Sequence, residues 1–511
     1  MKKIAEIYSR ALVSLEGSKV LANLVMAIAS AVHARSVVEY SESAVFHYQY
    51  SSISQLFIRI RAGETEHVSF FIKSAEAFVL SWLCKVPDFS RHGVIRTALD
   101  CTPVKKPHSA CLEDRQFVYT VNETIAGNKP VEIGYLLSSL NIGFEPKWSI
   151  PVSLVRVKSF ERAIAKGCGQ LEALVQSAAC AGKLVVNSAD SGYGHAAFMA
   201  PMQAHKNLVN VVRLRMCNVW SSDPRADTGG ANGIYGQTYH LRRVDAQTKY
   251  KDPKTGELAP AKPSICTRLA DKTESYEITT RRGKVIQIHL SLHNNMMKRS
   301  EKGHNMKDKP FDLVIVEASD KQTGKVMFSK PIYLAVCGQR KSEISLRQAY
   351  EEHYAHRYDI EPNNRFVKQQ LLLEKFATPI ADHFDMWLSV VCLAETLLLL
   401  TSSDLSTEQL KPKKKWHRTT PQTTISQTTT PKITGLPITR PSIANTRKAA
   451  ESFFLTFDQK PFLPKKSKKG NGREQGTQMP PKPRYNVVRK TKKRTKKAQK
   501  TETEPVKETK N

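Results

Sequence analysis

Two short apolar segments, each leading to an aspartate, constrain the fold of this chain more than any other feature. Val94–Cys101 and Lys183–Ser188 have the composition of buried β-strands, and Asp100 and Asp190 mark their carboxyl ends. Between them, Phe160–Ala181 carries Ala, Leu and Val at helical spacing. A helix between two such strands predicts an α/β fold whose sheet is partly parallel.

This alternation continues on both sides of the two segments. Before residue 218 we expect three further strands, at Gln116–Asn122, Val131–Leu140 and Leu208–Arg215, and one further helix, at His195–His205. Turn residues and β-like segments within residues 218–310 predict a β-rich insertion. Strand signals resume at Leu313–Val316 and Ile332–Val336, so residues 93–403 are interpreted as one α/β domain.

The two ends of the chain differ from this middle part. Residues 1–92 carry apolar side chains mainly at helical spacing and predict a helical region. Residues 404–511 are rich in Thr, Pro and Lys and bury too little apolar surface to offset the entropy of ordering. We therefore expect a mostly disordered basic tail, with Phe453–Phe457 as the one place where it docks.

The longest apolar segment, Met386–Leu400, raises the question of a membrane span. It is shorter than the roughly 20 residues that a spanning helix needs, and it contains Glu395. We interpret it as a core helix and expect no membrane segment.

Charge indicates the class of partner. The formal net charge is +31, and residues 401–511 carry 27 Lys and Arg against 8 Asp and Glu, which leaves +12 on the rest. A basic surface on both parts favours a polyanion, of which nucleic acid is the commonest and an anionic membrane the second choice.

A further motif, Tyr354-x2-Arg357-x3-Glu361-x6-Lys368, lies near the end of the domain. On an α-helix, at about 100° per residue, these offsets place all four side chains on one stripe. A carboxylate between two cations suits a divalent metal held beside a phosphodiester, with the cations on neighbouring phosphates. Two-metal phosphoryl transfer needs further carboxylates, and Asp100 and Asp190 are the best candidates because each ends a strand.

Together these residues resemble the D-D-E triad and Y-R-E-K signature of insertion-sequence DDE transposases. The surrounding segments agree: LDCTPVKKPHSACLEDRQFVY and GNKPVEIGY are similar to the region of the first aspartate, and NSADSGYGHAAFMAPM and NLVNVVRLR to that of the second. The resemblance covers about residues 93–400. It implies an RNase H-like mixed sheet flanked by helices, with a β-rich insertion between the second aspartate and the glutamate.

The resemblance also implies a function. Asp100, Asp190 and Glu361 would hold Mg²⁺ or Mn²⁺, as two ions, and Tyr354, Arg357 and Lys368 would contact DNA phosphates. The partners implied are double-stranded DNA, as transposon terminal inverted repeats and target DNA, and a second copy of the chain on paired ends. The helical region 1–92 is the candidate for end recognition, and a bacterial-type cytoplasm is the implied location.

Pro362 is a departure from the motif, because proline inside a helix removes a hydrogen bond and clashes with the preceding turn. A helix that begins near Pro362 would tolerate it, but the single stripe would loosen. Pro362 therefore keeps open a second interpretation, a catalytically inactive descendant that binds DNA as a repressor. A general nucleic-acid-binding protein driven by the tail, and a hydrolytic nuclease of the same core fold, are further alternatives.

Overall fold

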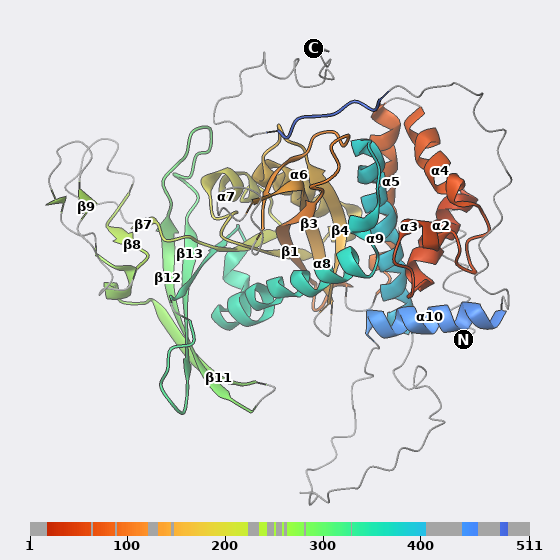
Figure 1. Cartoon of the computed structure of the whole chain (residues 1–511). Helices are drawn as coiled ribbons and strands as arrows, with labels where there is room; N and C mark the ends of the chain where they lie inside the picture. Colours follow the sequence, from red (N-terminus) through yellow and green to blue (C-terminus); the bar gives the residue numbers. More distant parts are fainter. Residues whose placement is uncertain are drawn as a thin grey trace, which may run out of the picture.

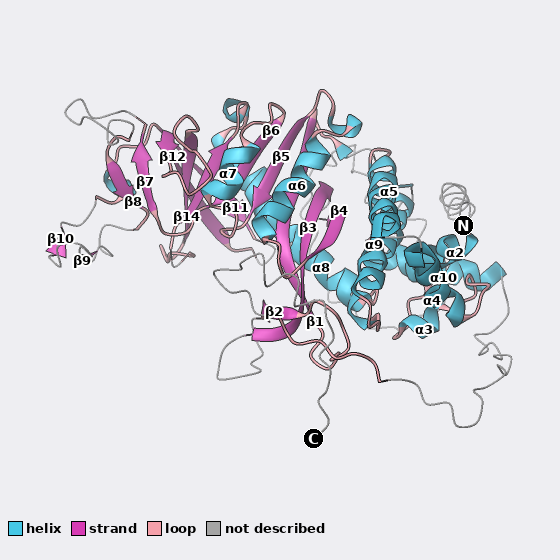
Figure 2. Ribbon diagram, turned by 90° about the horizontal axis from the view of Figure 1, so that it is seen from above, coloured by secondary structure: helices cyan, strands magenta, loops and turns pink. Residues whose placement is uncertain are grey.

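The computed structural model has a mixed α/β fold in which one large sheet meets a group of helices (Figures 1 and 2). Twelve of the described strands belong to this sheet, which contains parallel and antiparallel pairs. The predicted fold class is confirmed at this level. The structure describes residues 18–62, 65–86, 89–120, 131–144, 148–222, 235–242, 250–251, 258–259, 263–280, 283–328, 330–404, 442–457 and 481–488.

The centre of the sheet has the strand order β4-β3-β1-β5-β6. β1 pairs antiparallel with β3 and parallel with β5, β5 pairs parallel with β6, and β4 pairs antiparallel with β3. Helices α6 and α7 lie on one side of these strands and α8 lies on the other (Figure 1). The bounds are β1 Val94–Lys105, β2 Gln116–Tyr119, β3 Val131–Phe144, β4 Trp148–Val157, α6 Ala163–Val175, β5 Leu184–Ala189, α7 Ala196–Met202, β6 Leu208–Arg213 and α8 Ile360–Gln369.

Beyond β6 the sheet continues through strands of the later sequence. β14 pairs antiparallel with β6 and is followed by β13, β12, β7 and β8, while β11 pairs with β12 (Figure 2). Residues 218–310 thus contribute β7, β8, β11 and β12 to the main sheet. The bounds are β7 Asn218–Ser221, β8 Thr238–His240, β9 Tyr250–Lys251, β10 Leu258–Ala259, β11 Lys272–Thr279, β12 Val285–Met297, β13 Phe311–Asp320 and β14 Ile332–Cys337.

Helices from both ends of the chain gather beside β4 (Figure 1). α9 lies at their centre and contacts α2, α4, α5 and α10. α2 begins after Ser18, whose hydroxyl accepts a hydrogen bond from the Leu21 amide at 3.3 Å. The bounds are α2 Lys19–Ser30, α3 Val37–Tyr40, α4 Tyr50–Ala62, α5 Thr65–Leu83, α9 Ala381–Asp404 and α10 Ile443–Phe457.

The apolar helix α9 is longer than the sequence predicts. It has 24 residues instead of the expected Met386–Leu400, and Ala381–Ser403 is long and apolar enough to cross a membrane by length and composition. In this structure 89% of that apolar window is buried inside the protein. The prediction that the segment is too short was therefore wrong, and the prediction of a core helix is confirmed.

Two segments of the expected disordered tail are folded against the rest of the protein. Helix α10 packs on α2 and α9, and its Phe453 is buried, as the predicted docking at Phe453–Phe457 requires. Residues 481–488 lie beside β2, where the Tyr485 amide donates to the Ala110 carbonyl at 3.1 Å and the Val488 amide to the Arg115 carbonyl at 2.7 Å. The prediction of disorder is wrong for these segments, and the rest of 404–511 lies outside the described residues.

Helix α6 approaches β1 closely at Gly167. A Cβ atom there would lie 2.7 Å from Leu99 Cδ2 and 2.9 Å from Tyr193 Cε1, whereas at Gly169, on the same helix, a Cβ would meet nothing within 4 Å. Leu99 directly precedes Asp100, so this contact helps to place the strand that carries the first predicted catalytic residue.

We expect Gly167→Ala to destabilise the fold by about 1–3 kcal/mol, because Leu99 and Tyr193 must move. Gly169→Ala is the matched control, since it adds the same methyl group in open space and should stabilise the helix by about 0.5–1 kcal/mol. Urea unfolding of both variants measures the difference. Equal effects would show that the close approach at Gly167 has no energetic consequence.

Candidate active site

Asp100 and Asp190 lie on adjacent parallel strands at nearly the same level. The register of β1 and β5 ends with Leu99 opposite Ala189, so the two aspartates are the next residues on each strand. Asp190 follows the end of β5, as predicted, and its Oδ1 accepts a hydrogen bond from the Gly192 amide at 2.9 Å. Asp100 does not end its strand, because β1 continues to Lys105 and stays paired with β3.

The motif from Tyr354 to Lys368 is helical but is not one regular α-helix. Gln348–Tyr354 is a π-helix, Ala355–Asp359 is a 3₁₀-helix, and α8 begins at Ile360. These helices differ in residues per turn, so the four side chains do not keep a common angular spacing. Glu361 is exposed whereas Arg357 is buried. The predicted single stripe is therefore wrong.

Pro362 is accommodated without a break. It is the third residue of α8, within the first turn, where backbone N–H groups have no acceptor inside the helix. The chain enters α8 with helical backbone angles at Asp359. Pro362 therefore gives no structural reason to regard the site as damaged.

Arg357 connects the helical motif to the first aspartate. Its Nη1 donates to Asp100 Oδ2 at 3.4 Å, and its side chain is only 9% exposed. The guanidinium lies over the Tyr358 ring, 4.5 Å from the centroid, and 5.8 Å from the centroid of Tyr354. The two aromatic rings thus hold Arg357 toward Asp100.

The charges around Asp100 identify its neighbours. Burial raises the pKa of Asp100 to about 6, the Arg357 guanidinium opposes this shift, and the carboxylates of Asp190 and Glu361 add to it. Asp190, Glu361 and Arg357 therefore all lie near enough to act on the charge of Asp100. The fold brings Asp100 and Glu361 near each other although they are far apart in the sequence.

Tyr354 and Lys368 are placed differently from the prediction of phosphate contacts. Tyr354 has no exposed surface, so its side chain does not reach solvent in this structure. Lys368 Nζ donates to the Pro103 carbonyl and lies 3.6 Å from Glu374 Oε1, which ties α8 to β1. Burial lowers the pKa of Lys368. Both residues are engaged inside the protein next to the carboxylates.

Two further side chains near the carboxylates were missed by sequence reasoning. The Cys101 thiol lies 3.4 Å from the Tyr193 hydroxyl, and burial raises the pKa of each group. Cys101 directly follows Asp100, and Tyr193 lies three residues after Asp190. This nearness to the aspartates in the sequence is the signal that could have identified them. Cys101 pairs with Ser138, one position along from the Asp100–Ser139 pair, so its side chain points to the opposite face of the sheet.

The raised pKa of Asp100 predicts a pH-dependent effect of Asp100→Asn on stability without metal. A folded-state pKa of about 6, above the usual 3.8, means that protonation stabilises the fold. That contribution is complete below about pH 4 and is lost as the pH rises through 6. Asparagine stays uncharged, so the variant should be more stable than the wild type by about 3 kcal/mol at pH 8.

Thermal unfolding with a chelator between pH 4 and pH 8 measures this effect. The gain from Asp100→Asn should shrink steadily between pH 6 and pH 4, whereas Asp308→Asn, on an exposed loop, should show no such trend. A gain that does not vary with pH would contradict the unfavourable ionisation of Asp100.

The chemistry of the three carboxylates suits a hard divalent cation. They offer only oxygen donors, which Mg²⁺ and Mn²⁺ prefer, and a cation would relieve the cost of ionising Asp100 beside two like charges. In the part of the chain that the structure describes, no three Asp, Glu, His or Cys side chains already converge on one point. A metal ion bound by all three carboxylates would therefore require one or more of these side chains to move.

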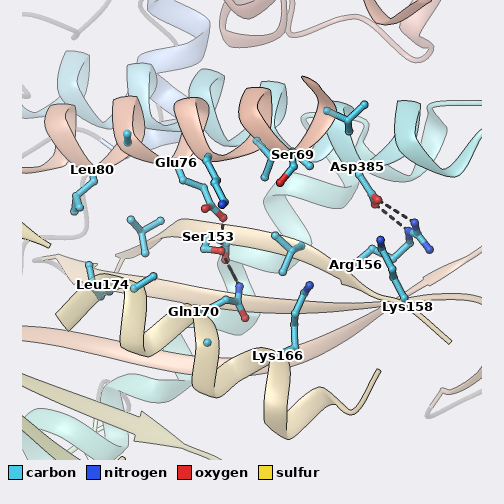
Figure 3. A pocket seen from close by; sticks show the side chains of 18 of the residues that line it. Ser69, Glu76, Leu80, Ser153, Arg156, Lys158, Lys166, Gln170, Leu174 and Asp385 are labelled. Atoms are coloured by element: carbon cyan, nitrogen blue, oxygen red, sulfur yellow. Dashed lines mark hydrogen bonds and ion pairs between the residues drawn. The ribbon is translucent and has the colours of Figure 1, made fainter. Parts of the chain in front are cut away.

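A cavity of about 660 Å³ lies between α5, β4, α6 and α9 and contains none of the predicted site residues (Figure 3). Its polar groups are largely paired with one another: Ser153 donates to Glu76, Gln170 Nε2 donates to Ser153 at 2.9 Å, and Arg156 pairs with Asp385. The carboxylates near Arg357 are the better candidate because they include the residues at which the two strand segments and the helical motif meet, and because Asp100 pairs with a cation there.

No protein-family model and no curated protein sequence match this chain.

Proposed function

We propose that the chain is a DNA transposase of the insertion-sequence DDE type, with Asp100, Asp190 and Glu361 as its acidic triad. The observation that carries this proposal is the electrostatic proximity of these three carboxylates, which come from β1, the end of β5 and the start of α8. Residues far apart in sequence that share one charged site are typical of a functional centre. The helical motif contributes Glu361, and the two strand segments lead to Asp100 and Asp190.

The order of the central strands supports the proposal at the level of the fold. An RNase H-like core has three antiparallel strands followed by two strands parallel to the first. The order β4-β3-β1-β5-β6, with helices after β4 and β5, fits that description. The strands that follow, up to β14, would then be the insertion and its return to the core.

The residues of the site would have different roles in DNA cleavage and joining. Asp100, Asp190 and Glu361 would hold Mg²⁺ or Mn²⁺ as two ions, and bound ions would supply the Lewis acid for attack by water and then by a 3′-hydroxyl. Arg357 holds the Asp100 carboxylate and favours its charged form. Tyr354 and Tyr358 orient Arg357, so Tyr354 would act through that cation.

The net charge of +31 supports DNA as the substrate, because every Lys or Arg that meets a phosphate releases a counterion. Paired transposon ends require two active sites, so a dimer on DNA belongs to the proposal. The helical region with α2, α4 and α5 is the proposed reader of end sequence, in a bacterial-type cytoplasm.

The proposal is tested with DNA that carries the inverted repeats flanking the gene. The purified chain with Mg²⁺ or Mn²⁺ should nick these ends and join the freed 3′-hydroxyls to a second DNA, and a chelator should stop both steps. Cleavage without joining would favour a hydrolytic nuclease of the same core.

A second candidate is a catalytically inactive descendant that binds DNA as a repressor. The ion pair between Arg357 and Asp100 favours it, because the cation already occupies one side of the carboxylate where a metal would bind. This candidate predicts end-specific DNA binding with no cleavage at any metal concentration. Loss of specific binding on deletion of the Lys-rich residues 489–511, which leaves α10 in place, would instead indicate a general nucleic-acid binder driven by the tail.

A further inference from the structure

Glu395 places a carboxyl group within the long apolar helix α9. It has no exposed surface, its Oε1 accepts a hydrogen bond from Asn363 Nδ2, and its Oε2 has no hydrogen-bond partner among the described residues. Burial raises the pKa of Glu395 well above its usual range, so burial disfavours the charged form of this side chain. Burying such a group is costly, and a leucine would pack in its place at lower cost.

Asn363 continues the contact from α9 into the sheet. Its Oδ1 accepts a hydrogen bond from Asn141 Nδ2 at 3.2 Å, and Asn141 Oδ1 accepts one from the Ser139 hydroxyl. Asn363, Asn141 and Ser139 are each no more than 1% exposed. A fully buried chain of side chains therefore joins α9, α8 and β3.

Two members of this chain, Ser139 and Asn363, border the proposed active site. Ser139 is the cross-strand partner of Asp100 in the β1–β3 register, and Asn363 lies two residues after Glu361. Cross-strand partners project from the same face of a sheet, so Ser139 shares the face of Asp100. The buried side chains thus connect the strand position of one carboxylate with the helical turn that bears another.

A second contact secures the same turn. Ser149 on β4 accepts a hydrogen bond from Asn141 Nδ2 at 3.2 Å and donates its own to the Asp359 carbonyl at 3.1 Å. Asp359 directly precedes α8. The start of the helix is therefore held from the sheet on one side and from α9 on the other.

We propose that Glu395 and Asn363 are positioning residues that fix the first turn of α8, and with it Glu361, at the level of Asp100. The inference rests on the proposed acidic triad, since it gives these residues a role only if Glu361 is a ligand. It explains why a core helix carries a carboxyl group at a position that packing alone would give to an apolar residue. Partners that orient a metal ligand typically change metal affinity by about 10–100-fold when removed.

Four variants separate positioning from simple core stability. Glu395→Gln keeps an uncharged hydrogen-bond acceptor for Asn363, whereas Glu395→Leu and Asn363→Ala remove the contact. Thr396→Val is the matched control, because Thr396 is equally buried on α9 but bonds only to the Cys392 carbonyl of its own helix. If Glu395→Leu fails to fold, Asn363→Ala still tests the same contact.

Two measurements are made on the full chain. Mn²⁺ affinity is measured by titration, and amide hydrogen exchange is followed in residues 363–369. We expect Glu395→Leu and Asn363→Ala to weaken Mn²⁺ binding by about tenfold or more and to speed exchange in α8 by a similar factor. Glu395→Gln and Thr396→Val should stay within about threefold of the wild type for both.

The two measurements test different claims: hydrogen exchange tests the positioning role, and Mn²⁺ binding tests the proposed triad. Unchanged α8 exchange in Glu395→Leu and Asn363→Ala would overturn the positioning role, whatever the metal result. Wild-type Mn²⁺ binding that is unaffected by Asp100→Asn would overturn the proposed triad instead. Slower α8 exchange in Glu395→Leu would also count against the inference, because it would show that the carboxyl group loosens the helix.

Discussion

Replacing Asp190 by asparagine is expected to lower metal-dependent cleavage of transposon-end DNA by about a thousandfold or more. Asn keeps the size of the side chain and one oxygen but removes the charge that a divalent cation requires. Asp190 lies at the carboxyl end of β5, where the backbone fixes its direction and the Gly192 amide holds one oxygen. Binding of the same DNA should change little, because phosphate contacts come from cations.

Asp312→Asn is the matched control for this prediction. Asp312 is also an aspartate on a strand of the main sheet, but its carboxylate pairs with Lys341 and does not act on Asp100. Its variant should cleave at the wild-type rate. Cleavage by Asp190→Asn within about threefold of the wild type would remove Asp190 from the triad.

Arg447→Ala is expected to destabilise the protein by about 3 kcal/mol. Arg447 on α10 is 1% exposed, and its guanidinium donates to the Ile28 carbonyl at 3.2 Å and to the Ala31 carbonyl at 2.6 Å. These carbonyls belong to the end of α2, where backbone acceptors lack partners within the helix and a cation is favoured by the helix dipole. Alanine would leave both carbonyls unpaired around a cavity.

Guanidinium unfolding of the full chain measures this loss, with Lys448→Ala as the control. Lys448 is the next residue of α10 and is exposed, so its removal should change stability by less than about 0.5 kcal/mol. If Arg447→Ala also changed stability that little, α10 would not be part of the folded core.

The sequence was sufficient to predict the strands β1, β2, β3, β5 and β6 and the helices α6 and α7, whereas the acidic triad stays a prediction. The end of β1 was misplaced at Cys101, although the strand continues through Pro103 to Lys105. In the structure β5 pairs only as far as Leu99, so beyond that point β1 has a free edge on that side and Pro103 interrupts no bond to β5. The strand β4, which pairs with β3, was not predicted from the sequence because it contains Pro151.

The predictions for the helical motif and for the tail were wrong for different physical reasons. The stripe from Tyr354 to Lys368 assumed one helical period, whereas local π and 3₁₀ turns change the period without a signal in residue spacing. The tail was judged by average composition. Helix α10 is a short segment whose Ile443, Ala450 and Phe453 are buried, and an average over the whole tail conceals it.

The proposed acidic triad is tested most directly by a crystal structure with Mn²⁺, with anomalous scattering recorded at the manganese edge. We predict a manganese peak bound by Asp100 and Asp190, with Glu361 turned toward it, and no such peak in crystals of Asp190→Asn. Manganese found elsewhere, or an Asp100 carboxylate that stays paired with Arg357 alone at saturating metal, would contradict the triad.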